Sequence, residues 1–273
     1  MARTASPSPR RTPSQRSNKG VAPAKFSPDA TAKASPAKKA AASSSPASSS
    51  AILSAVGPAD VIVLMFSISV WLYVMKSFGV PLFVPPSSLL TPLAVVAGVS
   101  PSQLLLYPSV WYNAKKFAKA CKKRKWKPVS VFAKLVAVGK TLQQVALFYW
   151  ASGGTLAGLT SLFTSASPTQ WAAFAVLFTI GQGLNASIYR AIGADGVYYG
   201  FKLGAPVPWS TAFPFSAGFR HPQYVGGYST QLGIFALVAS KPLIAAGLVP
   251  LALWWAALYV LNSAIEASDD NDA

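Results

Sequence analysis

The residues best suited to chemistry lie in the carboxyl-terminal third of the chain, between long apolar segments. Arg220 and His221 precede Pro222, which biases His221 away from helical geometry and can begin the next helix. Arginine offers paired N–H donors to a carboxylate or phosphate. Glu266 is the only glutamate and follows an apolar segment that, in a hairpin, returns it to the Arg220 end. This pattern predicts a binding site at a membrane face; the plainer alternative is a charge anchor, a packed imidazole and a helix-terminal acid.

A pair of glycines lies late in the preceding apolar segment. Gly181 and Gly183 are separated by one residue, and together they remove side chains from one patch of backbone. Such a patch permits close approach by a ligand or by a neighbouring helix. Asn185 and Ser187 add polar groups just beyond the pair. Both interpretations therefore stay open, a ligand contact and helix packing.

The composition favours a membrane protein. Hydrophobic residues make up 52% of the chain and charged residues only 11%, whereas a soluble domain carries about 25% charged residues. We expect an all-α fold, a polytopic membrane helical bundle of about five to six transmembrane helices in residues 56–266. Residues 1–55, rich in Ser, Pro, Ala and basic residues, are expected to form a disordered basic tail, and residues 267–273 an acidic tail.

Six apolar segments set the expected topology. Lys and Arg excess marks the cytoplasmic side, which places both termini, the basic Lys115–Lys140 loop, the Tyr189–Tyr224 loop and Glu266 on one cytosolic face. The expected spans are Pro58–Met75, Leu89–Trp111, Thr141–Phe163, Gln170–Ile192, Tyr224–Ala239 and Leu243–Leu261.

Several other classes are disfavoured. The net charge of +17 does not indicate a nucleic-acid partner, because the basic residues flank apolar spans. One cysteine and one histidine argue against an intrachain disulfide and a metal cluster. The eight basic residues from Lys115 to Lys127 indicate either attraction to anionic lipid headgroups or a topology signal alone. The amino-terminal tail is either a solvated cytosolic tail or a plastid or mitochondrial transit peptide.

The order of several short motifs resembles the phospholipid methyltransferase family, of the phosphatidylethanolamine N-methyltransferase type. FPFSAGFRHPQYVGG (Phe213–Gly227), an apolar hairpin and a terminal Glu266 are similar to the carboxyl half of that family. YPSVWYNAKK (Tyr107–Lys116) and GADGVYYG (Gly193–Gly200) are similar to two further family segments. Isoprenylcysteine carboxyl methyltransferases share the Arg-His-Pro-x-Tyr form. Unlike the family, which usually ends in two adjacent glutamates, this chain has Ile265 before its glutamate.

The resemblance implies S-adenosyl-L-methionine as methyl donor and no metal. Gly181 and Gly183 stand where the family has its Gly-x-Gly and would admit the cofactor. Arg220 or His221 would bind its carboxylate, and Glu266 would hold its amino group or ribose.

The resemblance also implies catalytic and substrate-binding residues. The lipid amine must lose a proton before it attacks, and His221, Glu266 and Tyr224 are the candidate catalytic residues. The candidate substrate-binding residues are Trp111, Asn113, Tyr189, Tyr198 and Phe215. Methyl transfer mainly requires positioning and a site screened from water.

The resemblance therefore implies N-methylation of phosphatidylethanolamine, or of its mono- and dimethyl derivatives, towards phosphatidylcholine. The substrate would be a phospholipid of the endoplasmic reticulum membrane, or alternatively of a plastid or mitochondrial membrane. Two alternatives are an isoprenylcysteine carboxyl methyltransferase and a membrane transporter or scaffold without enzymatic activity.

Overall fold

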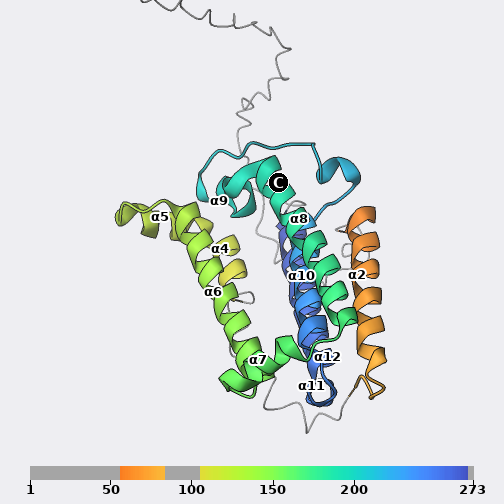
Figure 1. Cartoon of the computed structure of the whole chain (residues 1–273). Helices are drawn as coiled ribbons and strands as arrows, with labels where there is room; N and C mark the ends of the chain where they lie inside the picture. The colour runs from red at the N-terminus through yellow and green to blue at the C-terminus, as the bar shows by residue number, and fades with distance from the viewer. Residues whose placement is uncertain (1–55, 84–104, 270–273) are drawn as a thin grey trace, which may run out of the picture. The chain divides into compact units, whose positions relative to one another are not determined.

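The computed structural model describes residues 56–83 and 105–269, and within these every regular element is a helix, as expected (Figure 1). The predicted tail of residues 1–55 and most of the predicted span from Leu89 lie outside the described residues. The elements are α2 (Pro58–Ser77), α4 (Tyr107–Tyr112), α5 (Ala114–Lys123), α6 (Pro128–Ala151), α7 (Leu156–Thr164), α8 (Pro168–Val197), α9 (Gly200–Leu203), the short 3-10 helix Phe215–Ala217, α10 (Pro222–Val238), α11 (Lys241–Ala245) and α12 (Leu248–Asp269).

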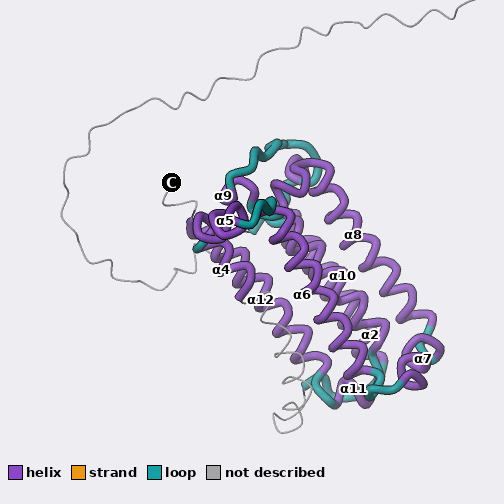
Figure 2. The backbone as a smooth tube through the Cα atoms, turned by 90° about the vertical axis from the view of Figure 1, so that its left-hand side faces the viewer, coloured by secondary structure: helices purple, strands orange, loops and turns teal. Residues whose placement is uncertain are grey.

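The connections between the long helices gather at two ends. Short helices α5 and α9 lie at one end, together with the loop between α9 and α10, and α7 and α11 lie at the other, as two views at right angles show (Figures 1 and 2). We call the first the loop end. The carboxyl end of α12 reaches the loop end, because Glu266 contacts Tyr199 there. The predicted convergence of the polar elements is therefore visible in the structure.

Helix α10 is the centre of the packing. Most of its 17 residues are buried, and it packs along α8, α2 and α12. Helix α10 lies very close to α8 at Gly226, where an added Cβ would lie 2.8 Å from the carbonyl oxygen of Gly181. Small residues at a contact allow two membrane helices to approach in this way. At the far end, the Gln170 amide donates to three carbonyl oxygens at the end of α10.

Four described helices are long and apolar enough to cross a membrane: Pro58–Ser77, Pro128–Ala151, Pro168–Leu203 and Leu248–Glu266. Exposed apolar side chains on these helices, such as Ile62 at 68% and Val145 at 58%, suit contact with lipid. Helix α10 is shorter than these four and is shielded by its neighbours. The chain is thus a helical membrane protein.

The expected span Thr141–Phe163 is wrong in its bounds. Helix α6 begins earlier, at Pro128, and ends at Ala151; Gly153 and Gly154 then adopt left-handed φ values of 61° and 73° before α7 begins. A glycine pair ends a helix because only glycine takes this conformation at little cost. The basic loop accordingly ends near Lys127, so Lys140 lies within a membrane helix rather than in a loop.

Two other bounds differ from expectation. Helix α8 continues five residues past Ile192, with a left-handed Gly193 (φ 66°, ψ 179°) inside it. The last span follows α11 and a turn at Gly247 (φ 106°), and it extends to Asp269, into the stretch expected to be a tail. Gly193 is not helical, so residues 194–197 continue beyond a break in α8.

Candidate functional site

The carboxylate of Glu266 joins three separate elements at the loop end. The Tyr199 hydroxyl donates a hydrogen bond of 2.5 Å to Glu266 Oε1, and the Tyr224 hydroxyl donates to the same oxygen. Tyr199 lies between α8 and α9, and Tyr224 lies in the first turn of α10. Residues 42 and 67 positions away in sequence from Glu266 therefore meet at a single oxygen.

Tyr199 is held in an unusual backbone conformation. Its φ of 57° lies in the left-handed region, which bulky residues rarely adopt and which persists only where the surroundings hold it. Its ring stacks on Phe132 at 5.2 Å between centroids and meets the edges of Trp111 at 4.9 Å and Tyr107 at 6.0 Å. This aromatic packing fixes the direction of the hydroxyl towards Glu266.

Trp111 and Asn113, two predicted substrate-binding residues, differ in exposure. Trp111 is only 6% exposed, and the ammonium of Lys202 lies 3.7 Å from its ring centroid, a cation–π contact. Asn113 is exposed at the joint between α4 and α5, and its amide donates to the Ser109 carbonyl over 3.2 Å. Trp111 thus supports the ring of Tyr199, and a role in substrate binding stays a prediction for both residues.

A buried aspartate holds the segment that carries Arg220 and His221. Asp60, only 1% exposed, accepts the backbone N–H groups of Arg220 (2.9 Å) and His221 (3.3 Å) on Oδ2. The same oxygen accepts the N–H of Gly57 over 2.8 Å at the start of α2. A Cβ at Gly57 would lie 2.2 Å from the carbonyl oxygen of Gly218, so only glycine allows this approach. Helix α2 therefore fixes the backbone of the Arg-His pair.

Tyr224 connects this corner with Glu266. Its ring lies 5.9 Å from the His221 imidazole, centroid to centroid, while its hydroxyl bonds Glu266. Pro222 is the first residue of α10 and His221 its N-cap, as the sequence indicates. The structure thus brings His221, Tyr224 and Glu266 together, and leaves the Arg220 side chain exposed beside them.

The two glycines of α8 do not share one patch. Gly181 faces α10, where an added Cβ would lie 2.1 Å from Thr230 Oγ1 and 2.4 Å from the Gly226 carbonyl oxygen. Gly183 is exposed, and an added Cβ would meet nothing within 4 Å. Two residues turn an α-helix by about 200°, so the pair points to opposite sides. Helix packing accounts for Gly181, which leaves Gly183 as the one with space for a ligand.

The remaining predicted substrate residues form a border at the loop end. The exposed Tyr189 donates a hydrogen bond of 2.6 Å to the hydroxyl of Tyr198, which ends α8. Phe215 packs against Ile188 and its apolar neighbours on α8. Tyr189 and Tyr198 thus lie together, whereas Phe215 anchors the loop that leads to Arg220.

A small pocket opens beside Tyr224, with room for about one water molecule in its enclosed part. It is lined by Tyr107, Lys140, Gln223, Tyr224, Tyr259 and Asn262. Among residues 56–83 and 105–269, no group of three or more His, Cys, Asp or Glu could hold a metal ion. Cys121 is buried on α5, and desolvation raises the pKa of its thiol.

Sequence reasoning missed Tyr199 and Asp60. Tyr199 is one of two adjacent tyrosines in GADGVYYG, and nothing in the motif says which one turns inward. Asp60 stands in the first turn of an apolar helix, where an acid usually serves the helix end alone. The sequence does indicate that Asp60 needs a polar partner, because a carboxylate is costly in lipid. It does not indicate which partner, because the backbone N–H of Arg220 lies 160 residues away in sequence.

Comparison with known proteins identifies the group to which these motifs belong. The phospholipid methyltransferase family model matches residues 169–267. Phosphatidyl-N-methylethanolamine N-methyltransferase of Arabidopsis thaliana is 31% identical over 173 residues, which cover 62% of this chain and 91% of that protein. The chain belongs to the phospholipid methyltransferase family. No solved structure matches it.

The part matched by the phospholipid methyltransferase model runs from α8 into α12 and includes Tyr199, Tyr224 and Glu266. Asp60, which holds the Arg220 backbone, and Phe132, which stacks on Tyr199, lie outside it. Helices α2 and α6 of this phospholipid methyltransferase thus hold site residues that belong to the matched part, through Asp60 and Phe132.

Proposed function

We propose that this protein transfers a methyl group from S-adenosyl-L-methionine to the amine of phosphatidylethanolamine or of its mono- and dimethyl derivatives, towards phosphatidylcholine. The observation that carries the proposal is the cluster of His221, Tyr224 and Glu266 at the loop end of a chain in this family. The name of the Arabidopsis relative supports the monomethylated lipid as one substrate.

The donor set of the cluster fits a cationic methyl donor. A carboxylate bonded to neutral tyrosines attracts a sulfonium and an amino group, and tyrosine faces add cation–π attraction. Glu266 would bind the amino group or ribose, and Arg220 or His221 the carboxylate. An added Cβ at Gly183 would meet nothing within 4 Å, and we propose that the cofactor lies against this part of α8. S-adenosyl-L-methionine supplies an electrophilic methyl group when it is bound.

The chain's own residues would manage the proton and the orientation. A protonated lipid amine has no lone pair, so it must lose a proton before a nitrogen–carbon bond forms and the carbon–sulfur bond breaks. His221 and Glu266 are the proton acceptors that we propose, with Tyr224 between them. Asp60 would keep Arg220 and His221 in place as a positioning residue.

The location of the site suits a lipid substrate. Glu266 ends a membrane-spanning helix, so a headgroup at the membrane surface can meet a soluble cofactor there. We propose residues 56–266 as the methyltransferase domain, in the endoplasmic reticulum membrane with the loop end in the cytosol. Tyr189, Tyr198 and Phe215 border that end and are the proposed lipid contacts.

Microsomes that express the chain test the proposal. Label from S-adenosyl-L-methionine should enter phospholipid, and Gly183→Leu should abolish this, because leucine fills the space proposed for the cofactor. Ala172→Leu is the matched control: it adds the same side chain to an exposed position of α8 roughly 16 Å further along the helix and should retain activity. Wild-type protein that labels no phospholipid but labels a prenylcysteine substrate would establish the isoprenylcysteine alternative instead.

A further inference from the structure

Helix α6 carries a lysine where a membrane helix normally excludes charge. Lys140 is the thirteenth residue of α6 (Pro128–Ala151), one of the four helices apolar and long enough to cross a membrane. At about 1.5 Å per residue it lies roughly 18 Å along the helix, near its middle. An ammonium group at this depth is costly, and such residues mark functional sites more often than structural ones.

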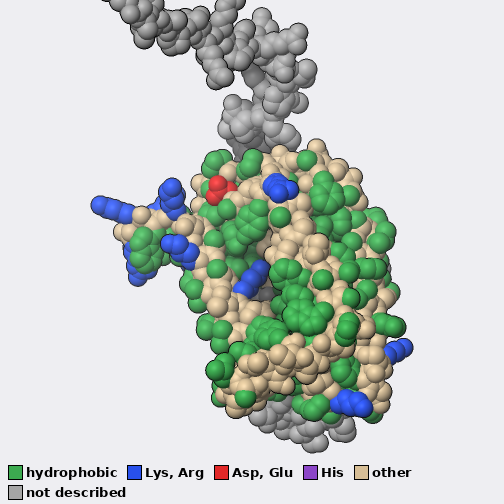
Figure 3. Space-filling model, in the orientation of Figure 1, with side chains coloured by type: hydrophobic (Ala, Val, Ile, Leu, Met, Phe, Trp, Pro, Cys, Tyr) green, Lys and Arg blue, Asp and Glu red, His purple; other side chains and the backbone are tan. Residues whose placement is uncertain are grey.

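The surroundings of Lys140 are polar but not acidic. Lys140 is exposed and is one of the residues that line the pocket beside Tyr224. The other residues that line this pocket contribute hydroxyl and amide groups from α4, α10 and α12. Within the described part of the chain, Lys140 makes no hydrogen bond or ion pair. The face shown in Figure 3 is hollowed between α6 and α8, and a basic side chain lies in the hollow.

An ammonium surrounded by neutral donors suits an oxyanion. Lysine binds phosphate as a point charge, and the amides of Gln223 and Asn262 can donate to further phosphate oxygens. Because Lys140 is exposed on a membrane-spanning helix, its long side chain can extend towards the headgroup layer, where lipid phosphates lie.

We propose that Lys140 binds the phosphodiester of the phospholipid substrate, an assignment that rests on the proposed function. Tyr224 lines the Lys140 pocket and also bonds Glu266, so the phosphate and the reacting amine would occupy adjacent positions. Lys140 would thereby select lipids with an anionic phosphodiester and direct the amine end of the headgroup to the loop end.

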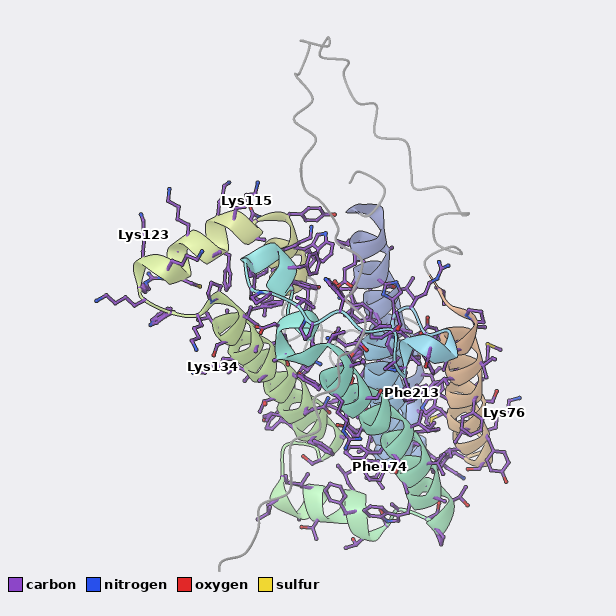
Figure 4. All side chains as sticks on the ribbon, turned by 90° about the horizontal axis from the view of Figure 1, so that it is seen from above. Lys76, Lys115, Lys123, Lys134, Phe174 and Phe213 are labelled. Atoms are coloured by element: carbon purple, nitrogen blue, oxygen red, sulfur yellow. The ribbon has the colours of Figure 1, made fainter. Side chains whose placement is uncertain are left out.

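Purified enzyme in mixed micelles tests this with three variants. Lys140→Met should raise the KM for phosphatidyl-N-methylethanolamine about tenfold or more, the loss expected for one charge-assisted contact, and leave the KM for S-adenosyl-L-methionine unchanged. Lys140→Arg retains the charge and should stay within about threefold of wild type. The matched control is Lys134→Met: Lys134 lies on the same helix (Figure 4), and it does not line the pocket. An unchanged lipid KM in Lys140→Met would overturn the assignment.

A binding measurement separates this proposal from the methyltransferase proposal. Phosphatidylmethanol carries the phosphodiester without an amine, and it should raise the melting temperature of wild-type protein in detergent more than diacylglycerol does. This difference should disappear in Lys140→Met and persist in Lys134→Met; persistence in both contradicts the assignment. Wild-type protein that shows the difference yet methylates no lipid would refute the proposed function alone.

Discussion

Two carboxylates at the loop end, Asp60 and Glu266, are held in opposite ways. Asp60 is fully enclosed, and its Oδ2 accepts backbone N–H groups alone, while its Oδ1 has no partner among the described residues. Glu266 is half-buried and accepts side-chain hydroxyls from Tyr199 and Tyr224. The first carboxylate accepts main-chain N–H groups, and the second accepts side-chain hydroxyl groups.

The difference separates positioning from ligand binding. Backbone N–H groups cannot leave a carboxylate without moving the chain, so Asp60 fixes where Arg220 and His221 lie. A tyrosine hydroxyl can rotate or exchange its acceptor, which leaves Glu266 able to bond an incoming cation. We therefore expect the loss of Glu266 to change chemistry and the loss of Asp60 to change geometry and stability.

The largest expected effect is that of Glu266→Gln. The amide keeps the shape and an acceptor oxygen for the two tyrosines, but it loses the charge that attracts the methyl donor. We expect kcat/KM for S-adenosyl-L-methionine to fall about 30- to 100-fold, which corresponds to about 2–3 kcal/mol. Folding stability should change by about 1 kcal/mol or less. Initial rates and thermal unfolding in detergent measure the two quantities.

Asp195→Asn provides the control for charge at the same end of the helices. Asp195 lies near the end of α8, and neither Tyr199 nor Tyr224 donates to it. Its substitution removes one negative charge and should leave kcat/KM unchanged. Equal losses in both variants would mean that net charge, rather than the Glu266 site, governs the rate.

Asp60→Ala should have the next largest effect. Three backbone N–H groups lose their acceptor, so we expect a loss of about 2–4 kcal/mol of stability. Among folded molecules the KM for S-adenosyl-L-methionine should rise about tenfold with a smaller change in kcat, because Arg220 and His221 are misplaced rather than lost. Steady-state kinetics on monodisperse protein, corrected for the folded fraction, measures both constants.

Asp60→Asn distinguishes positioning from general support. Its amide oxygen can still accept backbone N–H groups, so KM should return most of the way to the wild-type value. If Asp60→Ala lowers only the amount of folded protein and leaves the KM of that fraction unchanged, the aspartate is a stability residue and the contrast with Glu266 weakens.

Much of this arrangement could be predicted from sequence. Pro222 begins α10, and a hairpin of apolar segments returns Glu266 to the same end, because short connections make neighbouring helices antiparallel. These predictions needed only local signals and helix length. The start of α6 is harder to predict: Lys134 and Lys140 interrupt its apolar character, so the hydropathy pattern indicates a span that begins after them.

The contacts that complete the site depend on distances that no local pattern encodes. Gly181 and Gly183 look equivalent in sequence, and only the position of α10 makes one a packing residue and the other exposed. Tyr199 likewise becomes a partner of Glu266 because an aromatic cluster from α4 and α6 holds its backbone in a left-handed conformation. The periodicity of a helix indicates which residues share one of its faces, but it does not indicate which other helix packs against that face.

The smallest expected effect tests whether the two hydroxyls at Glu266 act together. Tyr199→Phe and Tyr224→Phe each remove one donor to Oε1 and should each lower kcat/KM about three- to tenfold, the value of one hydrogen bond. Because both donate to the same oxygen, the double variant should depart from the product of the single effects in a double-mutant cycle.

Tyr228→Phe is the control, since its hydroxyl donates to the Ala252 carbonyl in the core and its loss should affect stability alone. Strictly multiplicative losses at Tyr199 and Tyr224 would show that the hydroxyls act separately, and Glu266 would then be held no more flexibly than Asp60.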